Sequence, residues 1–422
     1  MNKNKHKLKI AIIGSGISGL TSAYILSKKH EVYLFEKNDY IGGHTHTHEI
    51  KENKNNINVD SGFIVYNENT YPNFIKLLDI LNIERQHTEM GFSVKSNSQD
   101  FEYAGNSINS IFSQRKNIFK PSFLKMVYDI LKFNYQSKRD IKKISTNITL
   151  KQYLDSSSYS KEFIDKYIIP MGAAIWSTSP ELMLQVPAVF FIRFFKNHGL
   201  LDITNRPQWW VIKNGSNQYV KEIIKPFKKN IKLNTKISSI ERKNNGAEVS
   251  YGDNKEFFDS VIIATHSDQA LLLIDDLTDK ESDILGKIKY QKNTALLHTD
   301  TSILPNRKIA WSSWNYLINH DQEKIVTLTY NMNILQTLKS NKTYCVTIND
   351  STNIDKSKIL KEIKYSHPLF TIDSVDAQKR KDEICGKNDT YFCGAYWGYG
   401  FHEDGVNSAL DVCKKFGLSL DD

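Results

Sequence analysis

The residues with the clearest chemical potential form two groups near the start of the chain. Gly14-Ser15-Gly16-Ile17-Ser18-Gly19 is a GxGxxG pattern, and Glu36 follows it after about twenty residues. Directly afterwards the stretch IGGHTHTHEI places His44, His46 and His48 at alternate positions. The glycines are suited to phosphate binding. The histidines are suited either to a zinc ion or to the side of a bound anion.

The elements around the glycines decide what they can bind. An apolar run over 8–13 predicts a strand, 17–28 has a helical pattern, and 31–35 predicts a second strand that ends on Glu36. In this frame Gly14 permits the tight turn, Gly16 lets the backbone approach a pyrophosphate, and Gly19 lets the helix pack on the strand. We therefore predict a dinucleotide site in which Glu36 accepts hydrogen bonds from the ribose and disfavours NADP.

The segment EKNDYIGGHTHT resembles the ExxxRxGGR/T extension of the flavin amine oxidase, protoporphyrinogen oxidase and phytoene desaturase superfamily. The resemblance implies FAD, with Lys37, Gly42, Gly43, His44 and Thr45 among its contacts. Tyr40 and His44 stand where that family has arginines.

Alternate residues of a strand share one face, so the three histidines are expected to project together. A metal there would compete with the cofactor, so we set zinc aside and predict that His44 donates to the phosphates.

Three further blocks carry the same resemblance. DSGFIVYNENTYPNF places Gly62 and Tyr66 where the family's chain passes near the flavin ring. The blocks NIKLNTKISS and VIIATHSDQA resemble the adenine-side strand and the turn near the cofactor, which implies contacts from Ile237 and Ala264. The block YFCGAYWGYGFHEDGVNSALDVC resembles the closing motif, where a helix N-terminus faces the flavin pyrimidine. A helix is predicted to start at Asp404 in this block. There the resemblance implies contacts from Gly394, Gly405, Val406 and Ser408, with Val406 N–H as a donor and Ala395 in place of the usual acid.

The same closing block holds the predicted catalytic residues. His402 is the leading candidate for a base, and Glu403 and Tyr66 are weaker candidates. Many amine oxidases carry a lysine near the flavin, but Asn293 or Thr294 stands at that place, next to Lys292. The motifs GGHTHT, DSGFIVYN, PMGAAIWS and CGAYWGYGFHEDG also resemble one branch of bacterial FAD-dependent oxidoreductases, which is often associated with cyclopropane-fatty-acid-synthase-like enzymes.

That resemblance implies dehydrogenation (desaturation) of an apolar, fatty acyl or lipid substrate by hydride transfer to flavin N5. Alternatives are a redox-neutral double-bond isomerase, an amine oxidase, and a flavin-holding partner of a lipid-modifying enzyme. The electron acceptor is not predicted.

Composition sets wider limits. The 422 residues carry a net charge of +9, but no binding module for nucleic acid is recognisable. The four cysteines form no CxxC pair, which favours reduced, structural thiols. No apolar run is long enough to span a bilayer, and the basic start of the chain lacks the pattern of a secretory signal. We therefore expect a cytoplasmic protein, with contact at the inner membrane face left open.

One segment bears on that membrane contact. A helix is predicted over 121–136, and its flanks are rich in lysine and arginine. Its apolar residues are compatible with one wide face: Phe123, Leu124, Val127, Ile130, Leu131 and Tyr135. That face predicts either a membrane-surface helix or a helix that packs on the core.

The predicted fold class is α/β (α+β overall), amine-oxidase-like. A Rossmann-like FAD-binding domain formed by 8–66, 211–268 and 385–420 is interleaved with a substrate domain of mixed sheet and helices formed by 67–210 and 269–384. FAD is expected to bind non-covalently, since no cysteine or histidine is suitably placed for attachment.

Overall fold

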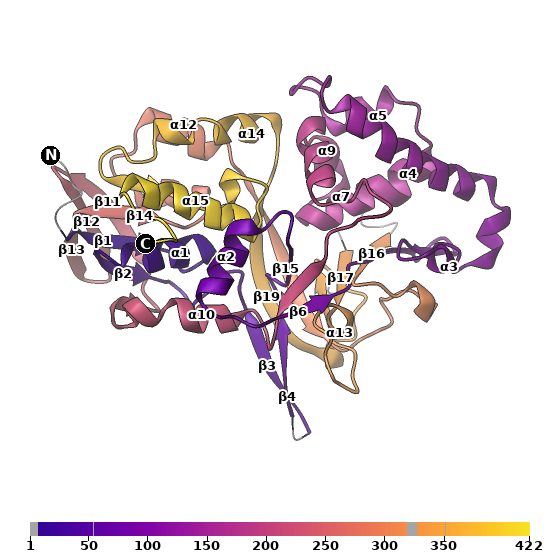
Figure 1. Cartoon of the computed structure of the whole chain (residues 1–422), viewed down its shortest axis with the longest axis horizontal. Coiled ribbons are helices and arrows are strands. Elements are labelled where there is room, and N and C mark those ends of the chain that lie inside the picture. Colours follow the sequence, from indigo (N-terminus) through magenta and orange to yellow (C-terminus); the bar gives the residue numbers. More distant parts are fainter. Residues whose placement is uncertain (1–6, 54, 319–326, 351) are drawn as a thin grey trace.

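The computed structural model describes residues 7–53, 55–318, 327–350 and 352–422 and shows two lobes (Figure 1). A five-stranded parallel sheet forms the centre of the first lobe. Its strands, in spatial order, are β10 (Ile231–Lys232), β2 (Glu31–Phe35), β1 (Lys9–Ile13), β14 (Ser260–Ile263) and β20 (Thr390–Phe392). The near-continuous apolar sequence of β1 and β14 is typical of strands covered on both faces.

The two faces of this sheet are covered by different layers. Ile10 and Ile12 of β1 pack with α1 (Ile17–Leu26), α10 (Asn217–Ile223) and α15 (His402–Lys415). Ala11 and Ile13 point the other way, because successive strand residues alternate. They pack on a three-stranded meander and two helices. These elements are β11 (Ile237–Lys243), β12 (Gly246–Tyr251), β13 (Asn254–Phe258), α11 (Ser267–Leu273) and α12 (Asp279–Gly286).

The second lobe combines a seven-stranded sheet with a group of helices (Figure 1). In spatial order the strands are β19 (Ile359–Pro368), β15 (Tyr290–His298), β18 (Cys345–Ile348), β17 (Thr327–Asn331), β16 (Trp314–Ile318), β7 (Phe92–Ser96) and β8 (Phe101–Ala104). We call the group of helices in the second lobe the helical lobe. It lies at the end of the seven-stranded sheet that carries β7 and β8. Its main helices are α3 (Ile108–Ile111), α4 (Pro121–Asp140), α5 (Leu150–Asp155), α7 (Ile169–Trp176) and α9 (Ala188–Asn197).

The hydrophobic cores do not follow the predicted domain boundaries at residues 66 and 268. Helix α2 (Pro72–Ile80) buries Phe74, Leu77 and Leu78 in the same cluster as β1 and α1. Helices α11 and α12 also pack on the parallel sheet. The core clusters of the parallel sheet therefore contain residues on both sides of positions 66 and 268.

Two small antiparallel sheets are formed by strands that follow the Gly42–Gly43 segment and by later strands. β3 (Thr47–Glu52) pairs with β4 (Asn55–Asp60), while β5 (Val65–Asn67) joins β9 (Trp209–Ile212) and β6 (Arg85–Thr88). No helix in the described part of the chain has the length and apolar character needed to cross a membrane. The basic tail over 1–6 lies outside the described residues.

Candidate functional site

A cavity of about 990 Å³ runs from the carboxyl ends of the parallel strands into the helical lobe. At the nucleotide-binding end it is lined by the glycine loop, by Glu36 to Asn38, by Thr235 to Ser238 and by Ala264 to His266. At the far end it is lined by side chains from the second lobe. Crevices at the carboxyl ends of parallel strands are the usual ligand sites of such sheets.

The three glycines of the GxGxxG pattern have different surroundings. Gly14 has φ +103°, and a Cβ there would lie 2.8 Å from the carbonyl oxygen of Ala264. A Cβ on Gly19 would lie 1.9 Å from the carbonyl oxygen of Gly14. A Cβ on Gly16 would meet no atom within 4 Å, and Gly16 lines the cavity together with Ser15, Ile17 and Ser18. Gly14 and Gly19 therefore serve the fold, and Gly16 leaves space for a ligand.

Glu36 lines the cavity, and its carboxylate is held by its neighbours. One oxygen accepts hydrogen bonds from the backbone N–H (3.0 Å) and the hydroxyl (2.6 Å) of Ser15. The other accepts from the backbone and the side-chain amide of Asn38, both at 2.9 Å. The predicted bond to a ribose stays a prediction, and it requires a ribose hydroxyl to replace one of these side-chain donors. Lys37 also lines the cavity.

The Gly42–Gly43 segment packs directly on the glycine loop. Gly42 N–H donates to the Ser15 hydroxyl at 3.2 Å, and a Cβ on Gly43 would lie 3.1 Å from Gly16 Cα. Gly43 lines the cavity. Thr45 does not: its hydroxyl is hydrogen-bonded to Tyr219 (2.5 Å) and to His402 Nε2 (3.0 Å). The expected contact between Thr45 and the cofactor is therefore replaced by a contact with His402.

His44 belongs to a cluster of aromatic rings that line the middle of the cavity. Its ring stacks on Tyr365 (centroids 4.7 Å apart) and lies 5.2 Å from His367 and 6.5 Å from His266. Burial lowers the pKa of His44 and His266 to about 4 and that of His367 to about 3, so all three are neutral at pH 7. His44 Nε2 is buried without a hydrogen-bond partner among the described residues, so it is available to a ligand.

The prediction that the three alternating histidines project together is wrong. Strand β3 begins only at Thr47, so His44 lies in the preceding turn and faces the cavity. His46 instead contacts His48, with ring centroids 4.1 Å apart, and stacks on Tyr40. Within the described ranges, no group of three His, Cys, Asp or Glu residues could hold a metal ion.

His402 lines the cavity as the first residue of α15. Its ring stacks on Phe63 with centroids 3.5 Å apart, and Nε2 is hydrogen-bonded to Thr45 Oγ1 and to Tyr219 OH (3.2 Å). Burial holds the pKa of His402 well below its usual value, so the imidazole is neutral. Since two hydroxyls occupy Nε2, proton transfer to a substrate would have to use Nδ1.

The two weaker candidates for a base are not in the cavity. The Glu403 carboxylate accepts hydrogen bonds from the backbone N–H groups of Asn73 (3.0 Å) and Phe74 (2.8 Å) and so caps the N-terminus of α2. Tyr66 is fully buried among Phe63, Tyr71 and Phe74. Neither residue lines the cavity, so both have structural positions.

The closing helix begins earlier than the predicted start at Asp404. Because α15 begins at His402, Gly405 N–H already donates to the carbonyl oxygen of Phe401 (3.1 Å), and Val406 N–H points along the helix to His402. The prediction that Val406 N–H is a free donor to the flavin is therefore wrong. The N–H groups without an intrahelical acceptor at this helix N-terminus are those of His402, Glu403 and Asp404.

The other predicted residues of the closing block divide between the cavity and the packing beneath it. Gly394 and Ala395 line the cavity, whereas Gly405 and Ser408 do not. A Cβ on Gly405 would lie 2.6 Å from the Ile17 side chain, so Gly405 brings α15 close to α1. The Ser408 hydroxyl accepts a hydrogen bond from Gly394 N–H at 2.9 Å. These two residues support the site without touching a ligand.

The remaining sequence candidates lie as follows. Gly62 lines the cavity, and a Cβ there would lie 2.1 Å from the carbonyl oxygen of His44, so the close approach at Gly62 is to the His44 backbone, and the predicted approach to the flavin ring stays a prediction. Ile237 and Ala264 line the nucleotide-binding end. At the place of the amine oxidase lysine, Asn293 is buried and its amide is hydrogen-bonded to His367 Nδ1 at 2.7 Å. The neighbouring Lys292 is exposed.

The far end of the cavity is apolar and aromatic. Its walls include Met171, Ile175, Trp176, Phe194, Phe370, Tyr399 and Phe401. Trp176 Nε1 donates to the Tyr399 carbonyl oxygen (3.1 Å), which ties the helical lobe to the closing block. Arg206 is exposed and also lines the cavity, so it marks an opening to solvent. Glu36 is the one acidic side chain in the described lining.

Sequence reasoning missed several of these residues. Tyr365 and His367 are two positions apart on β19 and so share one face, but nothing local in the sequence relates β19 to His44. Arg206 stands in a loop without a recognisable motif. The signal that places these side chains in the cavity is tertiary.

The residues present fit FAD. The glycine loop and Gly43 leave backbone open to the cavity, and the N-terminus of α1 opens beside them. Three buried polar atoms of the lining, His44 Nε2, Trp314 Nε1 and Tyr396 OH, have no partner among the described residues. The four cysteines are buried and lie outside the cavity lining, so none is placed for covalent attachment.

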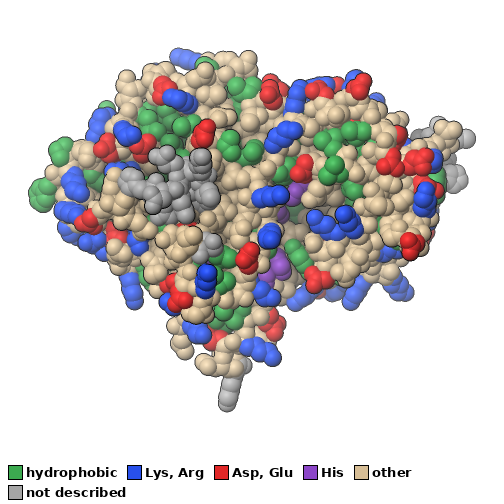
Figure 2. All heavy atoms as spheres, turned by 180° about the vertical axis from the view of Figure 1, so that it is seen from behind, with side chains coloured by type: hydrophobic (Ala, Val, Ile, Leu, Met, Phe, Trp, Pro, Cys, Tyr) green, Lys and Arg blue, Asp and Glu red, His purple; other side chains and the backbone are tan. Residues whose placement is uncertain are grey.

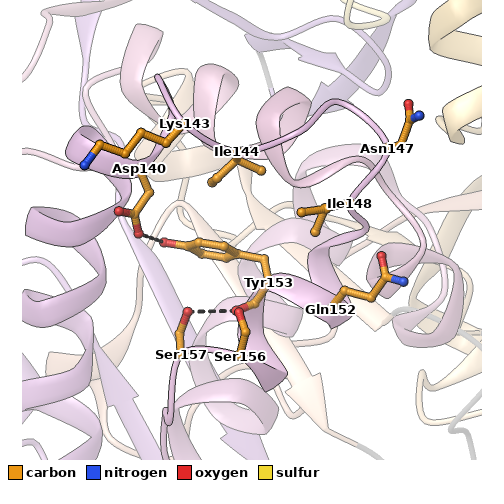
Figure 3. Close-up of a pocket in the computed structure, with 9 residues that line it drawn as sticks. All are labelled: Asp140, Lys143, Ile144, Asn147, Ile148, Gln152, Tyr153, Ser156 and Ser157. Atoms are coloured by element: carbon orange, nitrogen blue, oxygen red, sulfur yellow. Dashed lines mark hydrogen bonds between the residues drawn. The ribbon is translucent and has the colours of Figure 1, made fainter.

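A second, more open hollow of about 570 Å³ lies on the helical lobe (Figure 3). Tyr153 OH donates to Asp140 at 2.9 Å, and the hydroxyls of Ser156 and Ser157 donate to the Tyr153 carbonyl oxygen, both at 2.8 Å. These polar groups are satisfied by each other, and the hollow has no feature of a cofactor site.

Comparison with known proteins gives consistent results. The family model described as flavin containing amine oxidoreductase matches residues 17–342. No curated protein sequence matches the chain.

Many solved structures share the fold, and three of them serve as examples. A fatty acid isomerase from P. acnes that produces CLA has a TM-score of 0.69 at 13% identity, covering 97% of this chain and 98% of that one. Cyclohexylamine oxidase from Brevibacterium oxydans IH-35A has a TM-score of 0.69 at 13% identity, covering 97% and 99%. Putrescine oxidase bound to putrescine has a TM-score of 0.66 at 14% identity, covering 97% and 99%.

Proposed function

The chain belongs to the flavin-containing amine oxidoreductases and is an FAD-dependent oxidoreductase, and from this premise we propose that it oxidises an apolar acyl substrate. The observation that carries the proposal is the far end of the cavity, where apolar and aromatic walls lead to an opening marked by Arg206. The transfer of an alkyl chain from water to such walls lowers the free energy of the system. A carboxylate or phosphate at its end pairs well with a guanidinium.

The charge of the cavity argues against an amine as the natural substrate. Aromatic rings alone can attract an ammonium group. However, the acid of the described lining, Glu36, lies at the nucleotide-binding end, and no carboxylate stands among the apolar walls. An ammonium group there would lose its hydration without a counter-charge, which is costly.

FAD, when bound, supplies an acceptor for a hydride, and the protein supplies orientation and a dry environment. The walls formed by Trp176, Phe194 and Phe370 would hold the chain in place and exclude water. The neutral imidazole of His402 faces the cavity and can accept a proton from a substrate carbon at Nδ1, because hydroxyls occupy its Nε2. His44 Nε2, which has no partner among the described residues, is left to the cofactor.

A redox-neutral double-bond isomerase is the second candidate. It is supported by the similarity of the fold to that of a fatty acid isomerase and by the same apolar cavity. A desaturase needs an external electron acceptor, whereas an isomerase returns the hydride to the substrate. Turnover in the absence of an acceptor therefore separates the two.

The experiment is an anaerobic titration of the FAD-loaded protein with long-chain fatty acids, phospholipids and simple amines, with identification of products. Loss of flavin absorbance with an acyl substrate, together with a new double bond, supports the proposal. Bleaching by amines alone would overturn it in favour of an amine oxidase. No bleaching and no isomerised product with any acyl lipid would leave a flavin-holding partner as the function.

Arg206 offers a sharper version of the same test. Arg206→Gln should raise KM for a free fatty acid and leave KM for its methyl ester unchanged, because only the acid carries the charge that the guanidinium pairs with. Equal effects on both substrates would show that Arg206 does not recognise a carboxylate.

A further inference from the structure

The outer face of α4 is apolar where a surface helix is normally polar. Leu124, Tyr128, Leu131 and Tyr135 follow one another at spacings of four, three and four residues, which aligns them in one stripe. Their exposed fractions are 43%, 60%, 47% and 65%. The opposite face, with Phe123, Met126 and Phe133, is buried in the core of the helical lobe. The single wide apolar face expected from the sequence is thus divided into a buried side and an exposed side.

Exposed apolar side chains are concentrated in this part of the molecule. Of the thirteen large hydrophobic side chains that are exposed among the described residues, seven fall within 108–135. Besides the stripe these are Ile108, Ile118 and Phe119, and Phe119 is 85% exposed. Exposed apolar patches of this kind mark contact surfaces. We call residues 108–143 the basic-apolar face.

Positive charge surrounds the stripe. The basic-apolar face holds nine Lys and Arg residues and two acidic residues. Asp129 is buried, and Asp140 accepts a hydrogen bond from Tyr153 at the hollow of Figure 3. Lys116, Lys125 and Lys138 are ion-paired, and the other six basic side chains of this face form no ion pair within the described residues, so its charge is mainly positive. Figure 2 shows hydrophobic and basic side chains next to each other at the edge of the molecule that carries the helical lobe.

This face lies next to the opening of the cavity. Lys138, in the last turn of α4, forms an ion pair with Asp202. The loop that contains Asp202 also contributes Gly199, Leu200 and Arg206 to the cavity lining. In the same loop Ile203 is 68% exposed. The cavity entrance is therefore close to any surface that α4 contacts, and an apolar ligand could pass from that surface into the cavity.

We propose that the basic-apolar face docks the protein on an anionic lipid surface, with the cavity opening beside the bilayer. A helix with apolar residues on its outer side and lysines along its edges lies in the plane of the membrane interface. Tyrosine favours that interface, and each lysine near an anionic surface adds to binding. A protein partner would need an acidic, apolar complement. A bilayer of anionic lipids offers both properties everywhere on its surface.

The test is co-sedimentation of the full-length, FAD-loaded protein with vesicles of phosphatidylglycerol and phosphatidylcholine in equal parts, and with vesicles of phosphatidylcholine alone. We expect binding to the anionic vesicles and little to the neutral ones. Binding should weaken between about 0.1 M and about 1 M salt, because salt screens surface charge. Substrate is absent, so the result does not depend on the proposed activity.

Two pairs of variants locate the surface. Leu131→Glu should weaken vesicle binding about tenfold, whereas Leu360→Glu, at a side chain that is 42% exposed in β19, should leave it unchanged. Replacement of Lys120, Lys142 and Lys143 by Gln should weaken it about tenfold or more. The same change at Lys221, Lys228 and Lys229, which are exposed on the other lobe, should have little effect.

Three results would overturn the proposal. The first is equal binding to neutral and anionic vesicles, the second is wild-type affinity in Leu131→Glu, and the third is no vesicle binding at low salt. A concentration-dependent dimer that Leu131→Glu abolishes, without vesicle binding, would identify the face as a protein interface instead. Flavin content and circular dichroism of each variant establish that it is folded.

Discussion

Replacement of Gly16 by alanine separates cofactor binding from folding. Gly16 has φ −65° and ψ 175°, a conformation that any residue adopts, and an added Cβ would meet no atom within 4 Å. The methyl group would project into the cavity, where the backbone must approach the pyrophosphate. We therefore expect Gly16→Ala to fold normally and to bind FAD poorly.

The size of both effects can be estimated. Gly16 is the N-cap of α1, and alanine is a poorer N-cap, so the free energy of unfolding should fall by only about 0.5–1 kcal/mol. Loss of one charge-assisted hydrogen bond between the loop and a phosphate costs about 1.5–3 kcal/mol, which corresponds to about 10- to 150-fold weaker binding.

The assay is fluorescence titration of the apoprotein with FAD, together with thermal unfolding followed by circular dichroism. Gly19→Ala is the matched control: its Cβ would lie 1.9 Å from the Gly14 carbonyl oxygen, so it should lose about 3 kcal/mol or more of stability. FAD affinity of Gly16→Ala within twofold of the wild type would refute this account of the loop, as would an unfolded Gly16→Ala apoprotein.

Three other predictions concern single side chains. His44→Ala should lower FAD affinity about fivefold through loss of one hydrogen bond, whereas His46→Ala, outside the cavity, and a metal chelator should leave flavin content unchanged; a flavin loss caused by the chelator would revive a metal site. Glu403→Gln should lower stability by about 1–2 kcal/mol without shifting the pH profile of turnover, because Glu403 caps α2; a shifted profile would restore it as a base. Burial lowers the pKa of His298 to about 4, below the unfolded value of 6.5, so its contribution is present above pH 6.5 and is lost as the pH falls towards 4. His298 should contribute about 2 kcal/mol to the decrease in the free energy of unfolding between pH 7 and pH 5, measured by urea unfolding. His298→Gln should make that decrease smaller by the same amount.

The nucleotide-binding half of the site could be predicted from the sequence, because its signals are local. The tight turn at Gly14, the open approach at Gly16 and the packing at Gly19 follow from a strand, a loop and a helix that are consecutive in the chain. The frame of β1, α1 and β2 follows from the apolar pattern of fewer than thirty residues. Such short-range geometry determines the presence and the type of the cofactor fold.

The substrate half was decided by tertiary structure. His44 reaches the cavity because β3 begins after it, and its ring meets Tyr365 and His367 from a strand more than three hundred residues away in sequence. Glu403 turned out to be a helix cap, and Val406 an interior helix residue, because a start only two residues earlier changes which N–H groups are free. Periodicity also grouped Phe123 with Leu131 on one face of α4, although only the packing of that helix decides which residues are buried and which face water.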